Sequence, residues 1–356
     1  MGDMVKGNVA MGEAAIRAGM HMYAGYPITP STEIMEYLSW RAPQEDRVFI
    51  QAESEMAAMK MVYGAAATGA RVLTASSGLG ISCKQEGVSY MNMAQYPGVM
   101  INVVRYGDGL GSLMSGQTDY LREVKGAGNG DARMIVLSPS SVQEAYDLVY
   151  EAFDISQKYK SLVMILTEGG LGQMMEECEY SEMKTVPFAS WGYTGDRSKD
   201  EYRPMGMGAD VYAHALEMAA KRVTIKEEMQ RWESGFLDDA EYVMLGYGLP
   251  GRAIKSYVKA RRAEGEKIGY IRPISLWPFP EKAFKGINPG VKGFISVETS
   301  DDGGMVEDVA LYGKKYGSGF EKVPVYGLFC PPGIPTLRFI GEKFEDIKSG
   351  KMKEVF

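Results

Sequence analysis

The sequence has few cysteines, few histidines and no long apolar run. Its three cysteines, Cys83, Cys178 and Cys330, stand far apart and form no C-x-x-C motif. Neither a disulfide framework nor the four thiolates of an iron–sulfur cluster is therefore available within this chain. The two histidines, His21 and His214, leave little room for a zinc site or a histidine-based triad. Any chemistry must depend on carboxylates, hydroxyls, arginine or a cofactor.

An excess of basic residues is also missing. Lysines and arginines number 39 against 46 acidic residues, a formal net charge of −7, and the absence of a long basic cluster argues against a nucleic-acid surface. No apolar run approaches ~18 residues, the length needed to cross a membrane. Because the N-terminus lacks the apolar core of a signal peptide, we expect a cytoplasmic protein without a membrane partner.

What the sequence does contain is an alternation of short apolar runs and helical segments. Its 356 residues are 45% apolar and 24% charged, enough for two domains with a sizeable core. The alternation predicts an α/β fold with a mostly parallel sheet covered on both faces. It weakens over residues 176–239, where we predict an arm with one helix at 209–229. The predicted strands include 48–50, 71–75, 99–104, 134–137, 162–166, 268–271, 293–297 and 323–327.

Residues 26–33, Tyr-Pro-Ile-Thr-Pro-Ser-Thr-Glu, directly follow a predicted strand. The two prolines fix a tight exit turn. Thr29 is predicted as the N-cap of the next helix, with Pro30 at the first helical position and Glu33 where the helix dipole favours an acid. The Thr29 hydroxyl would then lie at the carboxyl end of a strand, where open α/β sheets bind ligands. By pattern alone, however, the stretch is an ordinary strand-to-helix loop.

The stretch resembles the signature of the 2-oxoacid:ferredoxin oxidoreductases, in the chain that carries their thiamine-pyrimidine domain. Further segments similar to this family are residues 51–80, 84–87, 117–120, 139–144, 271–280 and 304–308. The resemblance implies a thiamine-diphosphate pyrimidine-binding domain with a parallel sheet at 1–175, a connecting arm at 176–239 and a smaller transketolase C-terminal-like α/β domain at 240–356. It implies oxidative decarboxylation of a 2-oxoacid to acyl-CoA and CO₂ with reduction of ferredoxin.

The resemblance also implies site residues. Glu55 corresponds to the glutamate that bonds N1′ of the aminopyrimidine and favours its imino form, although by helix propensity alone it is simply an acid in a first helical turn. Arg105 corresponds to an arginine that binds the substrate carboxylate, a role that suits a planar, permanently charged group. Thr29 would be a second polar contact to the substrate. The cofactor-binding residues implied are Tyr26, Pro27, Ile28, Glu55, Ser77 and Gly78.

Partner chains follow from the same resemblance. A beta subunit would carry the diphosphate-binding domain and Mg²⁺. A gamma subunit and a ferredoxin-like iron–sulfur subunit would complete the complex, with [4Fe–4S] clusters on the partner chains and with coenzyme A and ferredoxin as reactants. Metal ligands are not expected on this chain, because Gly107-Asp108-Gly109 with Asn129 has a shorter spacing than the motif that holds Mg²⁺ and diphosphate.

Several alternatives remain open at this point. Residues 246–251 match the Gly-x-Gly-x-x-Gly dinucleotide fingerprint, so a nicotinamide-dependent dehydrogenase is a competing function. A non-oxidative decarboxylase or transketolase-like subunit is another, and iron content of the native complex would separate it from the oxidoreductase.

The substrate is a separate question. Residues 171–175 are most similar to the branch acting on 3-methyl-2-oxobutanoate (2-oxoisovalerate), although Tyr106-Gly107-Asp108 follows Arg105 where Gly-Gly-Pro is expected. We expect an apolar monocarboxylic 2-oxoacid to be preferred, because Asp108 facing the substrate tail would repel the second carboxylate of 2-oxoglutarate. Arg122 would cancel that repulsion if it reached the same pocket. A 2-oxoglutarate:ferredoxin oxidoreductase alpha subunit is therefore the alternative.

Overall fold

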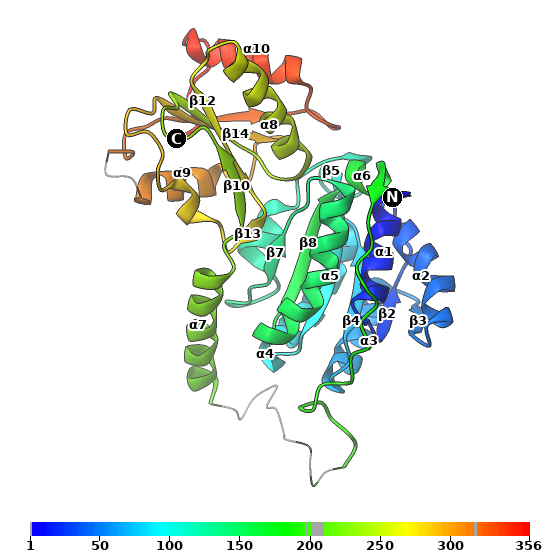
Figure 1. The fold of residues 1–356 in the computed structure, drawn as a ribbon. Coiled ribbons are helices and arrows are strands. Elements are labelled where there is room, and N and C mark those ends of the chain that lie inside the picture. Colours follow the sequence, from blue (N-terminus) through cyan, green and yellow to red (C-terminus); the bar gives the residue numbers. More distant parts are fainter. Residues whose placement is uncertain (1, 197, 199, 201–209, 317–318) are drawn as a thin grey trace.

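The structure, a computed structural model, describes residues 2–196, 198, 200, 210–316 and 319–356. Within these residues the chain forms two α/β units, each built on its own sheet (Figure 1). The N-terminal unit runs from blue to green in Figure 1, and the smaller C-terminal unit, yellow to red, lies against one end of it. The α/β fold class predicted from the sequence is confirmed.

The first sheet is parallel except at its edge strand and in one hairpin. Its strands are, in spatial order, β13 (Ser275–Trp277), β7 (Ile135–Leu137), β8 (Leu162–Glu168), β5 (Gly98–Tyr106), β4 (Val72–Ser76), β2 (Met22–Gly25) and β3 (Val48–Gln51), with β6 (Ser112–Ser115) paired to β5. Every residue of β4 and β8 is buried, so both faces of the sheet are covered. The strands β6 and β13 were not predicted, because each is short: β6 exists only through its hairpin pairing with β5, and β13 only through pairing with the distant β7.

Helices pack over this sheet in two groups. They are α1 (Gly7–Arg17), α2 (Thr32–Gln44) and α5 (Val142–Tyr159), which contact one another through α1, and α3 (Glu55–Ala67) and α4 (Leu79–Ala94), which contact each other. A short α6 (Gly169–Gln173) follows β8, and a single π-helical turn, η1 (Arg122–Gly126), precedes β7. The helix start expected at Glu55 is confirmed as that of α3, and Ser54 is its N-cap, because the Ser54 hydroxyl accepts from the Ala57 N–H at 3.2 Å.

The second sheet has the spatial order β10-β12-β11-β14-β15. Its strands are β10 (Trp232–Gly235), β12 (Ile268–Pro273), β11 (Tyr242–Leu245), β14 (Gly293–Glu298) and β15 (Val325–Phe329), all parallel except β10. Around it lie α8 (Gly248–Ala263), α9 (Met305–Tyr316), α10 (Leu337–Lys348) and a 3₁₀ turn, η2 (Glu281–Phe284). The strands at 268–271 and 293–297 are confirmed, whereas β10 and α10 were not predicted.

The arm between the units is more structured than its composition indicated. It begins with β9 (Met175–Cys178), which pairs antiparallel with β1 (Asp3–Lys6), and it contains α7 (Val211–Glu228). The helix predicted at 209–229 is confirmed as α7, although residue 209 lies outside the described residues. In the part of the chain that the structure describes, no helix is long and apolar enough to cross a membrane.

The predicted N-cap at Thr29 is wrong. The chain makes one more turn before the helix, since the Ile28 carbonyl accepts from the Ser31 backbone N–H at 3.0 Å and from its hydroxyl at 2.9 Å, and α2 begins at Thr32. The reason is a tertiary contact, because the buried Asn8 amide donates to the Pro30 carbonyl at 2.8 Å and holds it outside the helix. Thr29 is therefore an exposed turn residue.

The two units are joined by buried polar contacts. Arg272, 5% exposed at the end of β12, binds the Glu144 carboxylate with two bonds of 2.9 and 3.0 Å. The start of α5 is therefore only a partial capping box: the Ser141 hydroxyl accepts from the Glu144 N–H at 3.1 Å, but the Glu144 carboxylate accepts from the Ser140 N–H instead of that of Ser141.

A second contact between the units is centred on Glu168. This residue ends β8, is 2% exposed, and accepts from the Gln117 amide at 2.7 Å and from the Leu249 N–H at 3.0 Å. Gly248 has a φ of +57°, and a Cβ there would lie 2.1 Å from the Glu168 carboxylate, so only glycine allows this approach. Burial raises the pKa of Glu168 to about 7.

This raised pKa predicts a pH-dependent stability. The folded chain binds a proton at Glu168 up to about pH 7, whereas the unfolded chain releases it near 4.5, so ionisation of Glu168 lowers the free energy of unfolding as the pH rises between these values. Glu168→Gln keeps the shape and does not ionise. We expect the variant to be more stable than the wild type at pH 8, by up to about 3 kcal/mol, and equally stable near pH 4.5.

Urea unfolding of the full-length chain at a series of pH values measures this difference. Glu36→Gln, on the exposed side of α2, is the matched control and is expected to show no comparable pH dependence. A stability difference for Glu168→Gln that stays constant from pH 4.5 to pH 8 would contradict the assignment.

Candidate functional site

Four loops meet at one edge of the first sheet. The strands β5, β4, β2 and β3 are neighbours and parallel, so the residues that follow them lie at the same edge. Arg105 lies near the end of β5, Gly78 follows β4, Thr29 follows β2 and Glu55 follows β3. The structure therefore brings the three predicted catalytic positions to one region.

Arg105 is a nearly buried cation with a free donor. The residue is 8% exposed, and its Nη1 atom donates to the Thr29 backbone carbonyl at 3.5 Å. Its Nε is buried and has no hydrogen-bond partner among the described residues. Gly78, whose φ is +48°, lies directly against it, because a Cβ at Gly78 would stand 2.9 Å from Nε. The guanidinium can therefore accept an anionic ligand without breaking a strong internal contact.

Glu55 lies against the same turn, at Gly80. It is the first residue of α3 and is partly exposed, and its Oε1 atom lies 2.9 Å from the position that a Cβ on Gly80 would take. Gln51 and Glu53, which belong to the same pattern in the sequence, are exposed. Glu55, which is less exposed than these two, packs against the start of α4 at Gly80.

Two serine hydroxyls complete the turn. Ser76 and Ser77 are both fully buried, and neither Oγ has a partner among the residues that the structure describes. The predicted cofactor-binding residues Tyr26, Pro27 and Ile28 lie in the partly exposed loop after β2. A guanidinium, a carboxylate and two unpaired hydroxyls around one turn can together bind a polar ring and a carboxylate.

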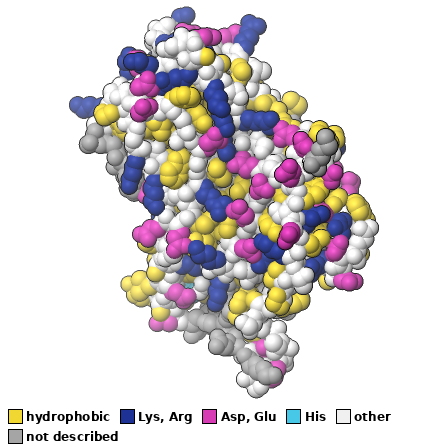
Figure 2. Space-filling view, in the orientation of Figure 1, with side chains coloured by type: hydrophobic (Ala, Val, Ile, Leu, Met, Phe, Trp, Pro, Cys, Tyr) yellow, Lys and Arg dark blue, Asp and Glu magenta, His cyan; other side chains and the backbone are white. Residues whose placement is uncertain are grey.

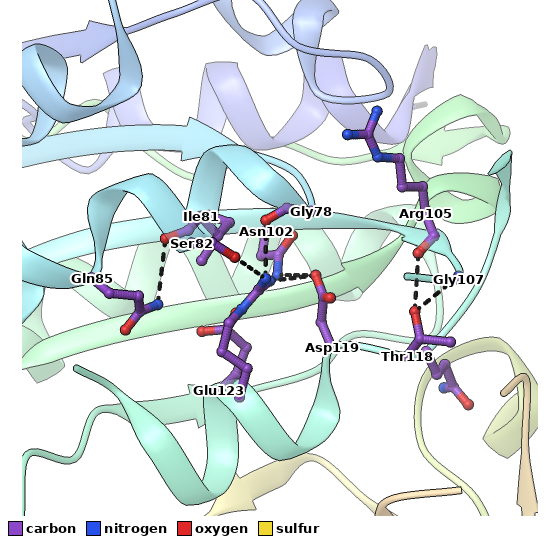
Figure 3. Close-up of polar contacts among 12 residues, drawn as sticks. Gly78, Ile81, Ser82, Gln85, Asn102, Arg105, Gly107, Thr118, Asp119 and Glu123 are labelled. Atoms are coloured by element: carbon purple, nitrogen blue, oxygen red, sulfur yellow. Dashed lines mark hydrogen bonds and ion pairs between the residues drawn. The ribbon is translucent and has the colours of Figure 1, made fainter. Parts of the chain in front are cut away.

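A buried charged cluster supports this turn from below (Figure 3). Arg122 donates to the Gly78 carbonyl at 3.0 Å and to the Ser82 hydroxyl at 2.9 Å, and forms ion pairs with Asp119 at 2.5 Å and Glu123 at 2.8 Å. Asn102 on β5 donates to both carboxylates, at 2.9 and 3.2 Å. Burial raises the pKa of Glu123 to about 7, although the Arg122 charge opposes the shift. Figure 3 shows the Arg105 side chain pointing away from this cluster.

Sequence reasoning missed this cluster. It considered Arg122 only as a cation that would cancel the Asp108 repulsion if it reached the substrate pocket, and the structure shows its guanidinium bound to Gly78, Ser82 and two carboxylates. A signal was present at Asn102, since an amide within the apolar run Val99–Val104 needs a polar partner in the core. The partner itself lies 17 to 21 residues away and is found only through the fold.

Two family models match the chain. "Pyruvate flavodoxin/ferredoxin oxidoreductase, thiamine diP-bdg" matches residues 13–235, and "Pyruvate:ferredoxin oxidoreductase core domain II" matches residues 240–327. The first match alone covers more than half of the chain. This chain belongs to the pyruvate flavodoxin/ferredoxin oxidoreductase family. Its thiamine-diphosphate-binding domain contains all four loops of the site.

Two curated relatives differ in their identity to this chain and in the substrate in their names. Ketoisovalerate oxidoreductase subunit VorB from Methanothermobacter thermautotrophicus is 44% identical over 314 residues, which are 87% of this chain and 89% of that protein. The 2-oxoglutarate synthase subunit KorA from Methanothermobacter marburgensis is 32% identical, over 83% of this chain and 87% of that protein. The higher identity is thus to a subunit named for ketoisovalerate.

Solved structures show the fold. The 2-oxoglutarate:ferredoxin oxidoreductase from Magnetococcus marinus, solved with 2-oxoglutarate, coenzyme A and succinyl-CoA bound, matches with a TM-score of 0.84 at 22% identity. The match covers 97% of this chain and 65% of that chain, so this chain spans less than two thirds of that protein. A split gene transketolase matches with a TM-score of 0.60 at 13% identity, over 99% and 100% of the two chains.

Within this family fold, the dinucleotide fingerprint has a packing role. The Leu249 N–H, at the N-terminus of α8, is taken by the Glu168 carboxylate at 3.0 Å, at the place where a dinucleotide phosphate would bind. A Cβ on Gly251 would lie 2.5 Å from the Gly246 carbonyl. The loop glycines therefore allow close internal packing, which argues against the nicotinamide alternative.

The other glycine-rich segment, residues 107–111, also has a structural role, because it forms the turn of the β5–β6 hairpin.

The ion pair between Arg122 and the buried Glu123 leads us to expect a large effect on stability when it is broken. Arg122→Met leaves the buried Glu123 carboxylate without its cation, which typically costs about 3–5 kcal/mol of unfolding free energy. We expect the double variant, Arg122→Met with Glu123→Gln, to lose less unfolding free energy than the two single variants lose in sum. The reason is that each single substitution leaves the other residue of the pair without its partner. Urea unfolding of the four chains measures the coupling.

The matched control is Arg338→Met, which removes an 87% exposed arginine paired with Glu342 within α10. Such an exposed pair contributes about 0–1 kcal/mol. Strict additivity of the two core substitutions would show that Arg122 and Glu123 do not act as a pair.

Proposed function

We propose that this chain is the thiamine-pyrimidine-domain subunit of a 2-oxoisovalerate:ferredoxin oxidoreductase. The observation that carries the proposal is that Arg105 lies against Gly78 and Glu55 against Gly80 of the same turn, with the buried Nε of Arg105 unpaired. The reaction converts a 2-oxoacid and coenzyme A to acyl-CoA and CO₂, and the two electrons released reduce ferredoxin.

Each residue has a distinct task in this proposal. Arg105 binds the C1 carboxylate of the substrate through its guanidinium, and Thr29, beside it, supplies a second polar contact. Glu55 shares a proton with the N1′ atom of the aminopyrimidine ring. Tyr26, Pro27, Ile28, Ser77 and Gly78 shape the pyrimidine site. Thiamine diphosphate, when bound, supplies the carbon nucleophile and holds the electrons released with CO₂.

The unpaired polar atoms of the turn support this assignment. Buried hydroxyls and guanidinium nitrogens without partners cost free energy, so a ligand that satisfies Ser76, Ser77 and Arg105 recovers part of that cost. The donor set matches a pyrimidine ring and a carboxylate. It contains no cluster of positive charge for a diphosphate, which we therefore assign to a partner chain.

The proposed complex divides the chemistry among chains. A beta subunit carries the diphosphate-binding domain with Mg²⁺, and a gamma subunit and a ferredoxin-like subunit complete the assembly, with [4Fe–4S] clusters on the partner chains. Three separate cysteines in this chain are too few for such a cluster. Beside the site, Tyr26, Met56 and Leu79 are 37%, 46% and 42% exposed, and these apolar side chains favour a protein partner covering Glu55.

Within the chain we propose residues 1–175 as the pyrimidine-binding domain, 176–239 as a connecting arm and 240–356 as a structural, transketolase C-terminal-like domain. The structural role of the last domain is supported by its contacts to the first, through Glu168 and Arg272, and by the packed loop at 246–251.

The substrate assignment rests on the relatives and on charge. Asp108 is exposed on the 107–111 loop, and it lines a small cavity together with Asp301 and Asp302. Negative charge near the Arg105 strand end disfavours a dicarboxylate such as 2-oxoglutarate, and Arg122 is engaged elsewhere and does not cancel it. Because Asp108 is in contact with water, it repels a second carboxylate 4 Å away by about 1 kcal/mol, instead of the ~4 kcal/mol of a pair at an effective dielectric near 20. The 2-oxoglutarate alternative is therefore weakened.

The assembled complex tests the function directly. Co-expressed with its partner chains, the protein should reduce ferredoxin only when 2-oxoisovalerate, coenzyme A and thiamine diphosphate are all present, and the native complex should contain iron. This chain purified alone should contain no stoichiometric iron and turn over no 2-oxoacid. An iron-free active complex would favour the non-oxidative, transketolase-like alternative.

Glu55→Gln is the sharpest single substitution for the mechanism. In the assembled complex we expect turnover to fall by about 10²–10⁴-fold, the usual cost of removing a positioned acid–base group, with assembly unchanged. Glu53→Gln, an exposed residue two positions earlier, is the matched control and should keep normal turnover. Near-normal kcat in Glu55→Gln would leave Glu55 as a helix-start acid only.

The substrate prediction is a ratio of kcat/KM values. We expect the wild-type complex to prefer 2-oxoisovalerate over 2-oxoglutarate, and Asp108→Asn to reduce the preference by about fivefold, as ~1 kcal/mol of repulsion implies. Asp238→Asn, in the exposed loop before β11, removes the same charge as a control. A wild-type preference for 2-oxoglutarate would refute the substrate assignment, and an unchanged ratio in Asp108→Asn would remove Asp108 from it.

A further inference from the structure

Lys84 is a fully buried lysine that the mechanism above does not use. It lies on α4 with 0% of its surface exposed. Its Nζ donates to the Thr74 hydroxyl on β4 at 3.1 Å and to the backbone carbonyl of Glu55 at 3.3 Å. Both acceptors are neutral, and no carboxylate of the described residues forms an ion pair with Lys84 within 4.0 Å. Burying an ammonium in this way is costly and requires a reason.

The position of Lys84 on its helix places it under the first turn of α3. Gly80, Lys84 and Gly87 are spaced one turn apart and share one side of α4. A Cβ on Gly80 would lie 2.9 Å from Glu55 Oε1, and one on Gly87 would lie 2.4 Å from Met59 Cγ, so this side faces α3 at close range. Lys84 lies between the two glycines and reaches past the start of α3 to β4.

The charges around Lys84 are few. Burial lowers its pKa to about 8, and the Glu55 carboxylate, the largest opposing influence, acts against this shift. The titratable groups that face it are Glu55 from α3 and Cys83 from its own helix, while β4 contributes the neutral Thr74. An apolar side chain of similar length would fill the same space without the cost of a buried charge.

We propose that Lys84 is a positioning residue for Glu55. Its ammonium holds the start of α3 through the Glu55 carbonyl, and its charge stabilises the carboxylate that remains when the Glu55 proton passes to the ring nitrogen bound beside it. No further reactant is needed, because one proton moves from the carboxyl to the ring and returns. The inference rests on the proposed function and assigns Lys84 to the same step as Glu55.

The test compares Lys84→Met and Lys84→Gln in the assembled complex. Both variants lose the charge, while glutamine keeps a hydrogen-bond donor. We expect both to lower kcat by about tenfold or more, because a neighbouring opposite charge changes a protonation equilibrium by about one pKa unit or more. KM for 2-oxoisovalerate should change little, since the substrate carboxylate contacts Arg105.

Two further readouts separate this role from a structural one. The affinity of the cofactor-free complex for thiamine diphosphate, followed by intrinsic fluorescence, should weaken in the wild type as the pH passes about 8, where Lys84 loses its charge, and should lack this step in both variants. The melting temperature of Lys84→Met should be equal to or higher than that of the wild type, because the variant removes a costly buried charge. A lysine with only a structural role would give a lower melting temperature.

Lys221→Met is the matched control. Burial also lowers the pKa of Lys221 to about 8, and its Nζ donates to two neutral oxygens at 3.0 Å, but it lies on α7 and contacts Gln95 and Lys160 instead of the site. It should keep the wild-type kcat and pH profile. Wild-type kcat in Lys84→Gln, or an equal loss in Lys221→Met, would overturn the proposal. A wild-type complex that binds no thiamine diphosphate would instead refute the proposed function.

Discussion

The contact between Gly78 and two arginines is the constraint on which the site depends. Arg105 lies against the turn from one side, and Arg122 binds the Gly78 carbonyl from the other. Gly78 has a backbone conformation that side chains disfavour, and a Cβ would also displace Arg105. The turn between β4 and α4 is thus fixed by charges on both sides, and Glu55 is positioned relative to it through Gly80.

The site is surrounded by polar groups that are costly to bury. Arg122 forms ion pairs with Asp119 and Glu123, whereas the hydroxyls of Ser76 and Ser77 have no partner among the described residues. The two cases have different consequences: the ion pairs hold the turn in place, and the unpaired hydroxyls of the turn favour a ligand that can pair with them. The first sheet can hold such groups because both of its faces are covered by helices.

The second unit stabilises the first through a shared sheet and buried polar contacts. Its strand β13 extends the first sheet, Arg272 binds Glu144, and the N-terminus of α8 is closed by Glu168. The glycines at 246–251 allow this close approach. A loop that has the sequence of a nucleotide site therefore serves as a contact surface between the units, since its Leu249 N–H is already bonded to Glu168.

The sequence by itself determined the α/β alternation and the start of α3 at Glu55, because hydrophobic period and helix-start signals are local properties. That Thr29, Glu55 and Arg105 share one site was expected from the family resemblance, since strand order depends on pairings between distant segments. It could not place the start of α2, which Asn8 decides from 22 residues away, or the strands β6, β10 and β13, which exist only as pairings. The partners of Arg122 and the burial of Lys84 were decided by tertiary structure alone. The sequence tells which side chains carry a charge. Which groups surround a charged side chain, and how much water reaches it, is decided only when distant segments pack together.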